Sequence, residues 1–293
     1  MRARPYPWLR CVAALALAAI AGLCGFACAQ EGELDKSPPK DQSPEQIIQR
    51  FAAHEKEWKL VREQYTFRQD ITVKTLNGDQ ALGDYHQVAD ISYNQGKRVK
   101  TVVLGPQPSI VLSPQDLEDL ESRASFTIGT DELPLYNVTY VGQQKVDELH
   151  CYLFDVAPKL IEKGKRYFQG KIWVDDRDLQ IVKNTGKSVP DIRITKRKRV
   201  EENLFPQFTT WRQQIEGKYW FPTFSSADDT LHFNSSEMRI KEVLKFTNYK
   251  QAGAATTGTV KGNVRYGRLK DSQARPNRRD TSATYHRSAP SGA

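Results

Sequence analysis

Cysteine is scarce in this sequence, with four residues among 293. Three of them precede residue 29, in a segment with the features of a removable export signal, so Cys151 is the only thiol that the mature chain would keep. A single thiol excludes an intrachain disulfide, although an oxidising compartment would permit one. Because Cys151 begins the apolar run Cys-Tyr-Leu-Phe, we expect a buried, unreactive thiol rather than a nucleophile.

Short catalytic motifs are also absent. The sequence has no Gly-x-Ser-x-Gly, no His-Glu-x-x-His, no phosphate-binding glycine-rich loop and no Cys-x-x-Cys, and its five histidines show no ligand spacing. The paired carboxylates at residues 175–176 and 228–229 fall at expected strand turns, where aspartate is common for local hydrogen-bonding reasons. We therefore expect neither an enzyme nor a metal or cofactor site.

Long hydrophobic runs are missing after residue 29. The one such run, residues 11–26, follows three arginines and is shorter than the roughly 20 residues of a membrane-spanning helix. It leads into Ala-Cys-Ala, which predicts a secretory signal peptide (residues 1–29), cleavage after Ala29 and an exported protein. In the alternative, Cys28 carries lipid and anchors the protein in the outer membrane, but Phe26 fits a lipoprotein recognition box badly.

The formal net charge of +8 is unevenly distributed. The basic excess lies in the signal peptide and in the tail, residues 251–293, whereas the segment between them is close to neutral. A basic average is typical of nucleic-acid binding, but an exported protein rarely meets nucleic acid, so we exclude that partner. The basic run Lys196–Arg199 is either a solvated loop or a contact with anionic lipid head groups.

Composition divides the mature chain into three parts. A polar linker, residues 30–42, contains two adjacent prolines, and the tail is rich in glycine, alanine, threonine and arginine. Neither part has enough apolar residues to offset the entropy of ordering, so we expect both to be disordered. Residues 43–250 between them are predicted to form the folded domain.

Two helices are predicted in this domain. Residues 43–46 form a capping-box pattern, and apolar residues then follow at three- and four-residue spacings: Ile47, Phe51, His54, Trp58 and Val61. A shorter helix is expected to begin at Ser113-Pro114 and to bury Leu117 and Leu120.

In most of the remaining domain apolar and polar residues alternate with a period of two, which predicts about ten antiparallel strands joined by short turns. The expected strands cover 65–73, a segment ending near 93, 99–104, 136–146, 149–156, 167–174, 179–184, 204–215, 219–233 and 238–249. The fold class is therefore mainly β (α+β). A meander of this length curls into a barrel or part-barrel, because strand twist disfavours large flat sheets.

The stretch from Trp211 to Phe224 carries five aromatic residues around one turn. On paired strands these rings fall on both faces, so both faces of the hairpin are partly apolar. One face of a curved sheet packs on a core. The second face must be covered, either permanently by helices or by a ligand that binds reversibly.

Several motifs resemble a known family. They are the strand pattern Phe-x-x-x-Ile-x-Val from Phe67, the Lys-Ile-Trp-Val-Asp of residues 171–175, the Leu-Gln-Ile-Val-Lys of residues 179–183, and the Gly-Lys-Tyr-Trp-Phe-Pro of residues 217–222. Over Ser43 to Lys250 the chain is similar to the bacterial outer-membrane lipoprotein-sorting proteins and their LolA/LolB-like relatives.

The resemblance implies an open antiparallel half-barrel, with helices across its concave face as a lid and acyl chains bound between them. It also implies an arginine near the second and third strands that controls the lid; Arg98 is the nearest match, and a solvated charge at a turn is the alternative. We expect the ligand to contact these residues: Trp58, Phe67, Arg98, Trp173, Trp211, Trp220 and Phe224.

The predicted function is non-catalytic binding of an acyl-bearing ligand, by a periplasmic carrier of lipids or lipoproteins. A lipid-sensing adaptor of the same architecture, which signals to a membrane partner protein, is an open alternative. An enzyme of unknown type is the other open alternative.

Overall fold

The structure is a computed structural model that describes residues 31–196 and 199–252. Within these ranges the chain forms twelve strands and two α-helices. None of the described helices has the length and hydropathy needed to cross a membrane. The predicted signal peptide and the predicted basic tail lie outside the described residues, apart from the tail's first two residues.

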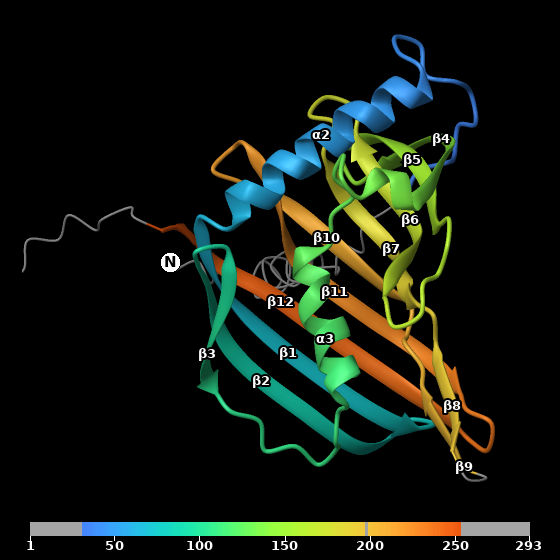
Figure 1. Cartoon of the computed structure of the whole chain (residues 1–293). Coiled ribbons are helices and arrows are strands. Elements are labelled where there is room, and N and C mark those ends of the chain that lie inside the picture. Colours follow the sequence, from blue (N-terminus) through green and yellow to red (C-terminus); the bar gives the residue numbers. More distant parts are fainter. Residues whose placement is uncertain (1–30, 197–198, 253–293) are drawn as a thin grey trace, which may run out of the picture. The chain divides into compact units, whose positions relative to one another are not determined.

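Ten strands form one antiparallel sheet (Figure 1). They are β1 (Tyr65–Asn77), β2 (Gln80–Asn94), β3 (Lys97–Leu104), β4 (Tyr136–Val146), β5 (Leu149–Pro158), β6 (Tyr167–Asp175), β7 (Ile181–Val189), β10 (Phe208–Ile215), β11 (Tyr219–His232) and β12 (Glu237–Gln251). Their order across the sheet is β3-β2-β1-β12-β11-β10-β7-β6-β5-β4. The sheet is curved and its edge strands β3 and β4 do not pair, which confirms the predicted mainly β, open half-barrel.

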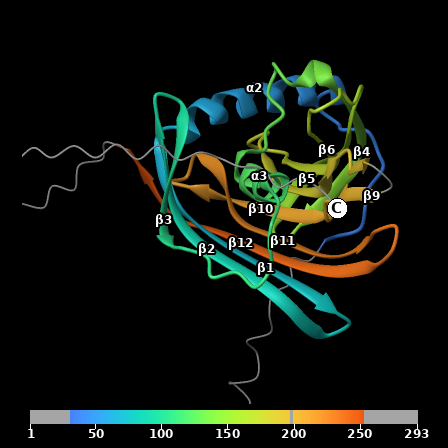
Figure 2. The ribbon, with the colours of Figure 1, turned by 60° about the horizontal axis from the view of Figure 1, so that its bottom comes forward.

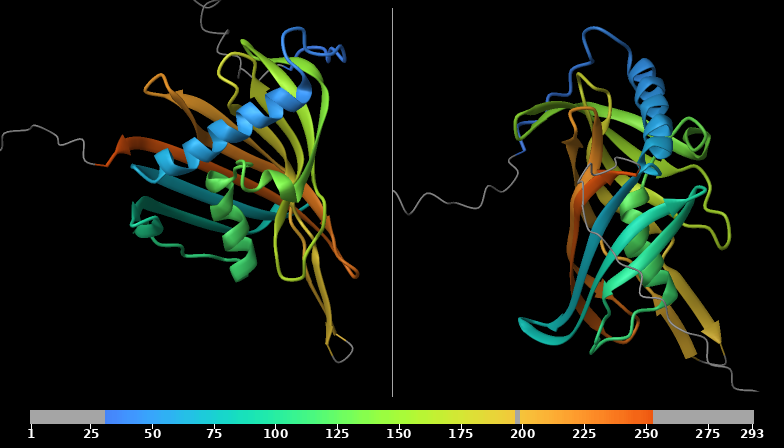
Figure 3. Two further views of the ribbon diagram at one scale, coloured as in Figure 1. Left: turned by 45° about the horizontal axis from the view of Figure 1, so that its top comes forward. Right: turned by 90° about the vertical axis from the view of Figure 1, so that its left-hand side faces the viewer.

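Helices α2 (Pro44–Arg62) and α3 (Pro114–Ser122) both lie on the inner side of this curved sheet (Figures 2 and 3). We call this side the concave face and the opposite side the convex face. α2 begins with the predicted capping box, in which Ser43 pairs with Gln46, and α3 begins at the predicted residues with a capping box of its own, in which Ser113 pairs with Asp116. A short 3-10 turn, η1 (Arg123–Ser125), continues α3, and another, η2 (Leu133–Leu135), precedes β4.

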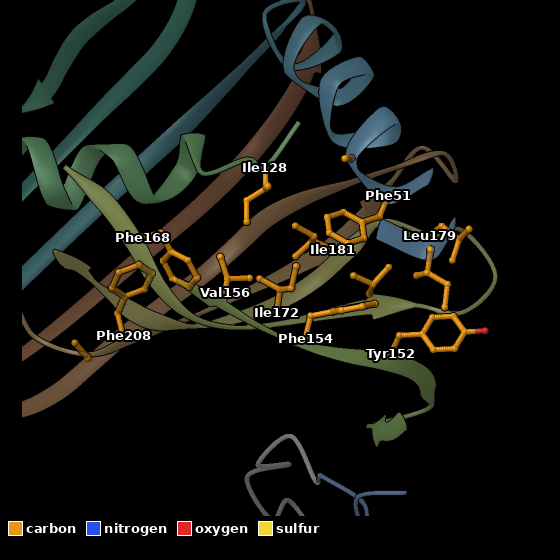
Figure 4. Packing of buried hydrophobic residues seen from close by; sticks show 14 residues of the cluster. Phe51, Ile128, Tyr152, Phe154, Val156, Phe168, Ile172, Leu179, Ile181 and Phe208 are labelled. Carbon is orange, nitrogen blue, oxygen red and sulfur yellow. The ribbon is translucent and has the colours of Figure 1, made fainter. Parts of the chain in front are cut away.

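The concave face carries two hydrophobic clusters. The first packs under α2, where the Phe51 ring centroid lies 5.7 Å from that of Phe154, with Ile172 and Ile181 beside them (Figure 4). The second lies on β1, β2, β11 and β12 and includes Leu120 of α3. Apolar residues at helical spacing thus meet apolar residues at strand spacing, and their burial stabilises the domain by roughly 25 cal/mol per Å² of apolar surface.

A hairpin lies where no strand was predicted. No strand is predicted from the sequence between residues 184 and 204, but β8 (Ile192–Lys196) pairs with β9 (Arg199–Asn203) as a separate two-stranded sheet. β10 begins at Phe208 rather than at residue 204. These strands were not predicted because the segment is rich in charged residues, although Ile192 and Ile194 alternate with polar residues as a half-buried strand requires. Residues 197–198 of the basic run lie outside the described residues.

Part of the predicted linker is attached to the sheet. The backbone N–H of Gly32 donates to Lys145 at 2.8 Å, and Asp35 and Gln143 exchange backbone hydrogen bonds of 2.8 and 2.7 Å. Residues 31–35 therefore lie along the edge strand β4 and satisfy part of its free edge. Composition could not indicate this contact, because backbone pairing does not need apolar side chains.

Cys151 is buried in a small cluster with Leu153, Trp173 and Val182, as predicted. Burial raises the pKa of its thiol to about 12. At pH 8 only about 10⁻⁴ of such a thiol is thiolate, against roughly a quarter of an exposed cysteine. In a chain that begins at Gln30, we expect Cys151 to react with dithionitrobenzoate about a thousandfold more slowly in the native state than in denaturant. A stoichiometric reaction of the native protein within seconds would contradict this, with Cys151→Ala as the blank.

Candidate ligand-binding site

A large cavity lies on the concave face beside α3. Its volume is about 710 Å³, and its walls come from α3, the segment before α3, the β8–β9 hairpin and the far ends of β11 and β12. We call it the α3 cavity. Most of its lining is apolar: Ile110, Leu112, Leu120, Ile192, Ile194, Leu204, Phe205, Leu231, Phe233, Met238 and Ile240.

The local sequence explains why the lining of this cavity is apolar. Leu231 and Phe233 at the end of β11, and Met238 and Ile240 at the start of β12, flank a turn at the end of the sheet. The β8–β9 hairpin adds Ile194, whose side chain is 43% exposed and therefore not sealed into a core. Apolar side chains left partly accessible in this way favour a ligand that can cover them.

Buried charges lie next to α3. Arg123 donates to Asp119 at 2.8 Å and pairs with Glu242 at 2.7 Å, and all three side chains are at most 5% exposed. Ser188 donates a hydroxyl hydrogen bond to Asp119. Burial raises the pKa of the Glu242 carboxyl above its usual range. Buried charges are tolerated only when paired, so this cluster fixes the end of α3 against the sheet.

A second, smaller cavity of about 320 Å³ lies against the other side of α3, and we call it the arginine cavity. Arg123 and Arg166 line it, together with the acidic residues Glu118 and Asp119 and with six hydroxyl-bearing residues: Ser122, Ser125, Thr127, Tyr136, Tyr167 and Ser188. Its lining is more polar than that of the α3 cavity. Gln115 and Asp119 line both cavities, so the two adjoin at α3.

Arg98 connects the edge strand β3 to α3. Its Nη1 donates to Glu121 of α3 at 2.7 Å, and its Nη2 donates to the side-chain oxygen of the buried Gln69 in β1 at 2.9 Å. Lys100 also donates to Glu121, at 2.6 Å. Arg98 is therefore a partly buried contact between sheet and helix rather than a solvated charge at a turn. Control of a lid by Arg98 stays a prediction.

The seven predicted ligand contacts do not form one site. Trp58 and Phe67 lie on the concave face, in packed clusters. Trp173 and Trp211 contribute to a cavity on the convex face, as their strand parity relative to Ile172 and Thr210 requires. Trp220 and Phe224 also lie outside the α3 cavity, and so does Arg98.

The convex-face cavity, of about 510 Å³, is built around a lysine between two indoles. Lys183 Nζ lies 4.5 Å from the ring centroid of Trp173 and 5.6 Å from that of Trp211, within the range of cation–π attraction. Glu31, from the segment along β4, forms an ion pair with Lys183. The second apolar face of the aromatic hairpin is thus covered in part by the chain's own residues.

Sequence reasoning missed the residues that line the α3 cavity. Ile192 and Ile194 carried a usable signal, since they alternate with Arg193 and Thr195. Arg123 and Arg166 carried no such signal, because they are far apart in the sequence and line one cavity only in the folded chain. Within the described ranges, no cluster of His, Cys, Asp and Glu could hold a metal ion.

Comparisons with known proteins give similarity of structure only. No family model matches the sequence, and no curated protein matches it significantly. Similar solved structures include a DUF1329 family protein from Desulfovibrio piger, with 12% identity, 73% of this chain and 96% of that chain covered, and a TM-score of 0.37. A LolA superfamily protein from Nitrosomonas europaea has 16% identity, coverages of 70% and 92%, and a TM-score of 0.32.

A third similar structure is a domain from Vibrio parahaemolyticus described as an outer membrane lipoprotein-sorting protein. It has 10% identity, coverages of 70% and 93%, and a TM-score of 0.33. The second and third structures come from the family that the sequence resembles. The likeness is distant and concerns the fold, so the function of this chain has to be argued from its own residues.

Proposed function

We propose that this protein is an exported, periplasmic carrier that binds the acyl chain of a lipid or lipoprotein in the α3 cavity. The observation that carries the proposal is the apolar lining of that cavity, which combines a volume of about 710 Å³ with partly exposed side chains such as Ile194. Small-molecule pockets typically have volumes of about 300–1,000 Å³. The signal peptide predicted from residues 1–29 supports the location.

The binding energy of such a cavity comes from apolar burial. Each acyl methylene removed from water contributes about 0.8 kcal/mol, so a 16-carbon chain gains on the order of 12 kcal/mol before ordering costs. No specific polar contact is needed for this gain. A cavity with a mostly apolar lining is therefore sufficient for an acyl chain of variable structure.

A carrier must also release its cargo, and α3 is the element that would move. Its outer side is held by Glu121, which contacts Arg98 and Lys100 at 2.7 and 2.6 Å. Partly exposed ion pairs of this kind contribute about 1 kcal/mol or less. Separation of α3 from β3 therefore has a low cost, which suits an adjustable lid that moves about the end of α3 held by the Asp119–Arg123–Glu242 cluster.

Filling the cavity with a large side chain should weaken acyl binding. Met238 lines the cavity and is only half-buried, so we expect Met238→Trp to fold and to displace two or three methylenes of the ligand. At about 0.8 kcal/mol each, this loss corresponds to palmitate binding weakened about fifteenfold to sixtyfold. Displacement of the neutral fluorophore N-phenylnaphthylamine would measure it.

The matched control is Leu82→Trp. Leu82 is an exposed strand residue, with 59% exposure, and it lies outside the three cavities described above. It tests whether an added indole changes probe binding by itself. Equal palmitate affinities for Met238→Trp, Leu82→Trp and the parent chain would contradict binding in the α3 cavity.

A lipid-sensing adaptor is the second candidate function, and the edge strand β3 favours it. Val102, Val103 and Leu104 of β3 are 47%, 52% and 48% exposed, beside the Arg98–Glu121 contact that a bound ligand would disturb. Exposed apolar edge strands are ready to pair with another chain. Transfer of a labelled lipid to acceptor vesicles separates the two functions: a carrier delivers the lipid unaided, whereas an adaptor binds it without delivery.

A further inference from the structure

Two arginines in the arginine cavity have hydrogen-bond donors without acceptors. Nε and Nη1 of Arg123 and Nη2 of Arg166 are buried and find no partner among the described residues. The Arg123 side chain is 1% exposed. Native proteins rarely leave charged donors buried and unpaired, because such groups lose hydration without compensation. An acceptor-rich ligand group in this cavity would supply the missing partners.

We propose that the arginine cavity binds an oxyanionic head group, carboxylate or phosphate, of an amphiphile whose acyl chain occupies the α3 cavity. The inference rests on the proposed function and narrows its ligand to anionic amphiphiles. The planar guanidinium group presents forked N–H donors that match the spacing of carboxylate and phosphate oxygens. Six hydroxyl-bearing residues line the same cavity, and two of them, Ser125 and Thr127, donate no side-chain hydrogen bond among the described residues and supply further neutral donors.

The two cavities adjoin where such a ligand requires it. Gln115 and Asp119 line both of them. The guanidinium carbon of Arg166 lies 3.4 Å from the ring centroid of Phe205, a residue that lines the α3 cavity. A head group beside Arg166 would therefore place the first methylenes of its chain next to Phe205 and lead them into the apolar cavity.

The charges around the two arginines differ. Arg123 already pairs with Asp119 and Glu242. Arg166 has no carboxylate within ion-pair distance among the described residues; its Nη1 donates to the backbone oxygen of Pro190 at 2.9 Å. Burial is the main cause that lowers the pKa of Arg166, and the carboxylates of Asp119, Asp191, Glu118 and Asp116, none of them a direct partner, offset it only in part. Arg166 is thus the primary candidate for the anion.

Replacement of Arg166 by glutamine distinguishes binding of the head group from binding of the acyl chain. We expect Arg166→Gln to weaken binding of palmitate and of hexadecyl phosphate about tenfold to a hundredfold, the range for a hydrogen bond to a charged group. Binding of the uncharged methyl palmitate should change less than about twofold. Affinities come from displacement of N-phenylnaphthylamine, and a thermal melt of each variant verifies folding.

Arg62→Gln is the matched control. Arg62 also donates to a backbone oxygen, that of Ser125 at 2.6 Å, has a buried unpaired Nε, and lies over an aromatic ring, that of Trp58. It lines none of the three cavities described above. We expect Arg62→Gln to leave the preference for palmitate over methyl palmitate unchanged. Equal losses in both arginine variants would overturn the inference.

The outcomes separate the inference from the proposed function. If palmitate and methyl palmitate both bind and Arg166→Gln affects them equally, the head-group site is wrong and the carrier proposal stands. If neither binds to the parent chain, both fail. If inorganic phosphate alone stabilises the parent chain but not Arg166→Gln, and hexadecyl phosphate binds no tighter, the cavity binds a free oxyanion and the amphiphile assignment is overturned.

Discussion

Replacement of Trp58 by alanine is expected to lower the free energy of unfolding by about 3–5 kcal/mol. The Trp58 side chain is 1% exposed, and its ring centroid lies 5.8 Å from that of Phe221. The guanidinium carbons of Arg62 and Arg212 lie 5.2 and 4.7 Å from the ring centroid. The change therefore removes apolar burial, leaves a cavity and removes two cation–π contacts. Urea titration followed by circular dichroism would measure the loss.

Leu60→Ala in the same helix is the control, because Leu60 is 63% exposed and its removal should change stability by less than about 0.5 kcal/mol. The sequence predicted Trp58 as a ligand contact, and the experiment distinguishes that role from packing. A Trp58→Ala protein of unchanged stability with weaker palmitate binding would show that Trp58 borders a ligand space. A large loss of stability with unchanged affinity would show that it is core.

Replacement of Glu55 by glutamine is expected to destabilise the domain by about 3–5 kcal/mol, because it leaves the buried charge of Arg212 without its counter-charge. Glu55 of α2 and Arg212 of β10 are at most 2% exposed and form two hydrogen bonds, of 2.8 and 3.2 Å. Arg212 also donates to the backbone oxygen of Phe126 at 2.7 Å. The pair thus joins α2, the sheet and the segment after α3.

A double variant tests the cause of this loss. Glu55→Leu combined with Arg212→Met replaces both charges with apolar side chains of similar volume, which is often neutral in buried pairs. We expect the double variant to recover most of the stability that Glu55→Gln loses. If it is as unstable as the single variant, the charge itself is not the cause. The positions of α2 and β10 would then depend on the hydrogen bonds of Arg212.

Local patterns were sufficient to predict most of the fold. The strand predicted at residues 136–146 matches β4, and the capping pattern at Ser43 correctly begins α2, because alternation and capping depend on neighbours in the chain. The missed β8–β9 hairpin was the exception, since its charges outweighed the short alternation of Ile192 and Ile194.

The candidate site could be predicted from the sequence much less well than the fold. The aromatic residues of the Trp211–Phe224 hairpin were obvious locally, yet two of the tryptophans singled out, Trp173 and Trp211, line the convex-face cavity instead. Glu55 was not identified from the sequence, because its partner Arg212 is remote in the chain. The α3 cavity arises where α3, the β8–β9 hairpin and the ends of β11 and β12 converge, and such contacts follow from topology rather than from local composition.

The pairing of β1 with β12 also determines the order in which the domain can be assembled. Tyr65 pairs with Gln251 and Leu76 with Arg239, so the first and last strands of the described domain are neighbours in the sheet. Until β12 has been synthesised, β1 exposes an unpaired edge next to apolar side chains such as Ile71 and Val73. Long-range pairing of this kind slows folding and leaves the nascent chain prone to aggregation, so the unfinished domain should depend on a holding chaperone.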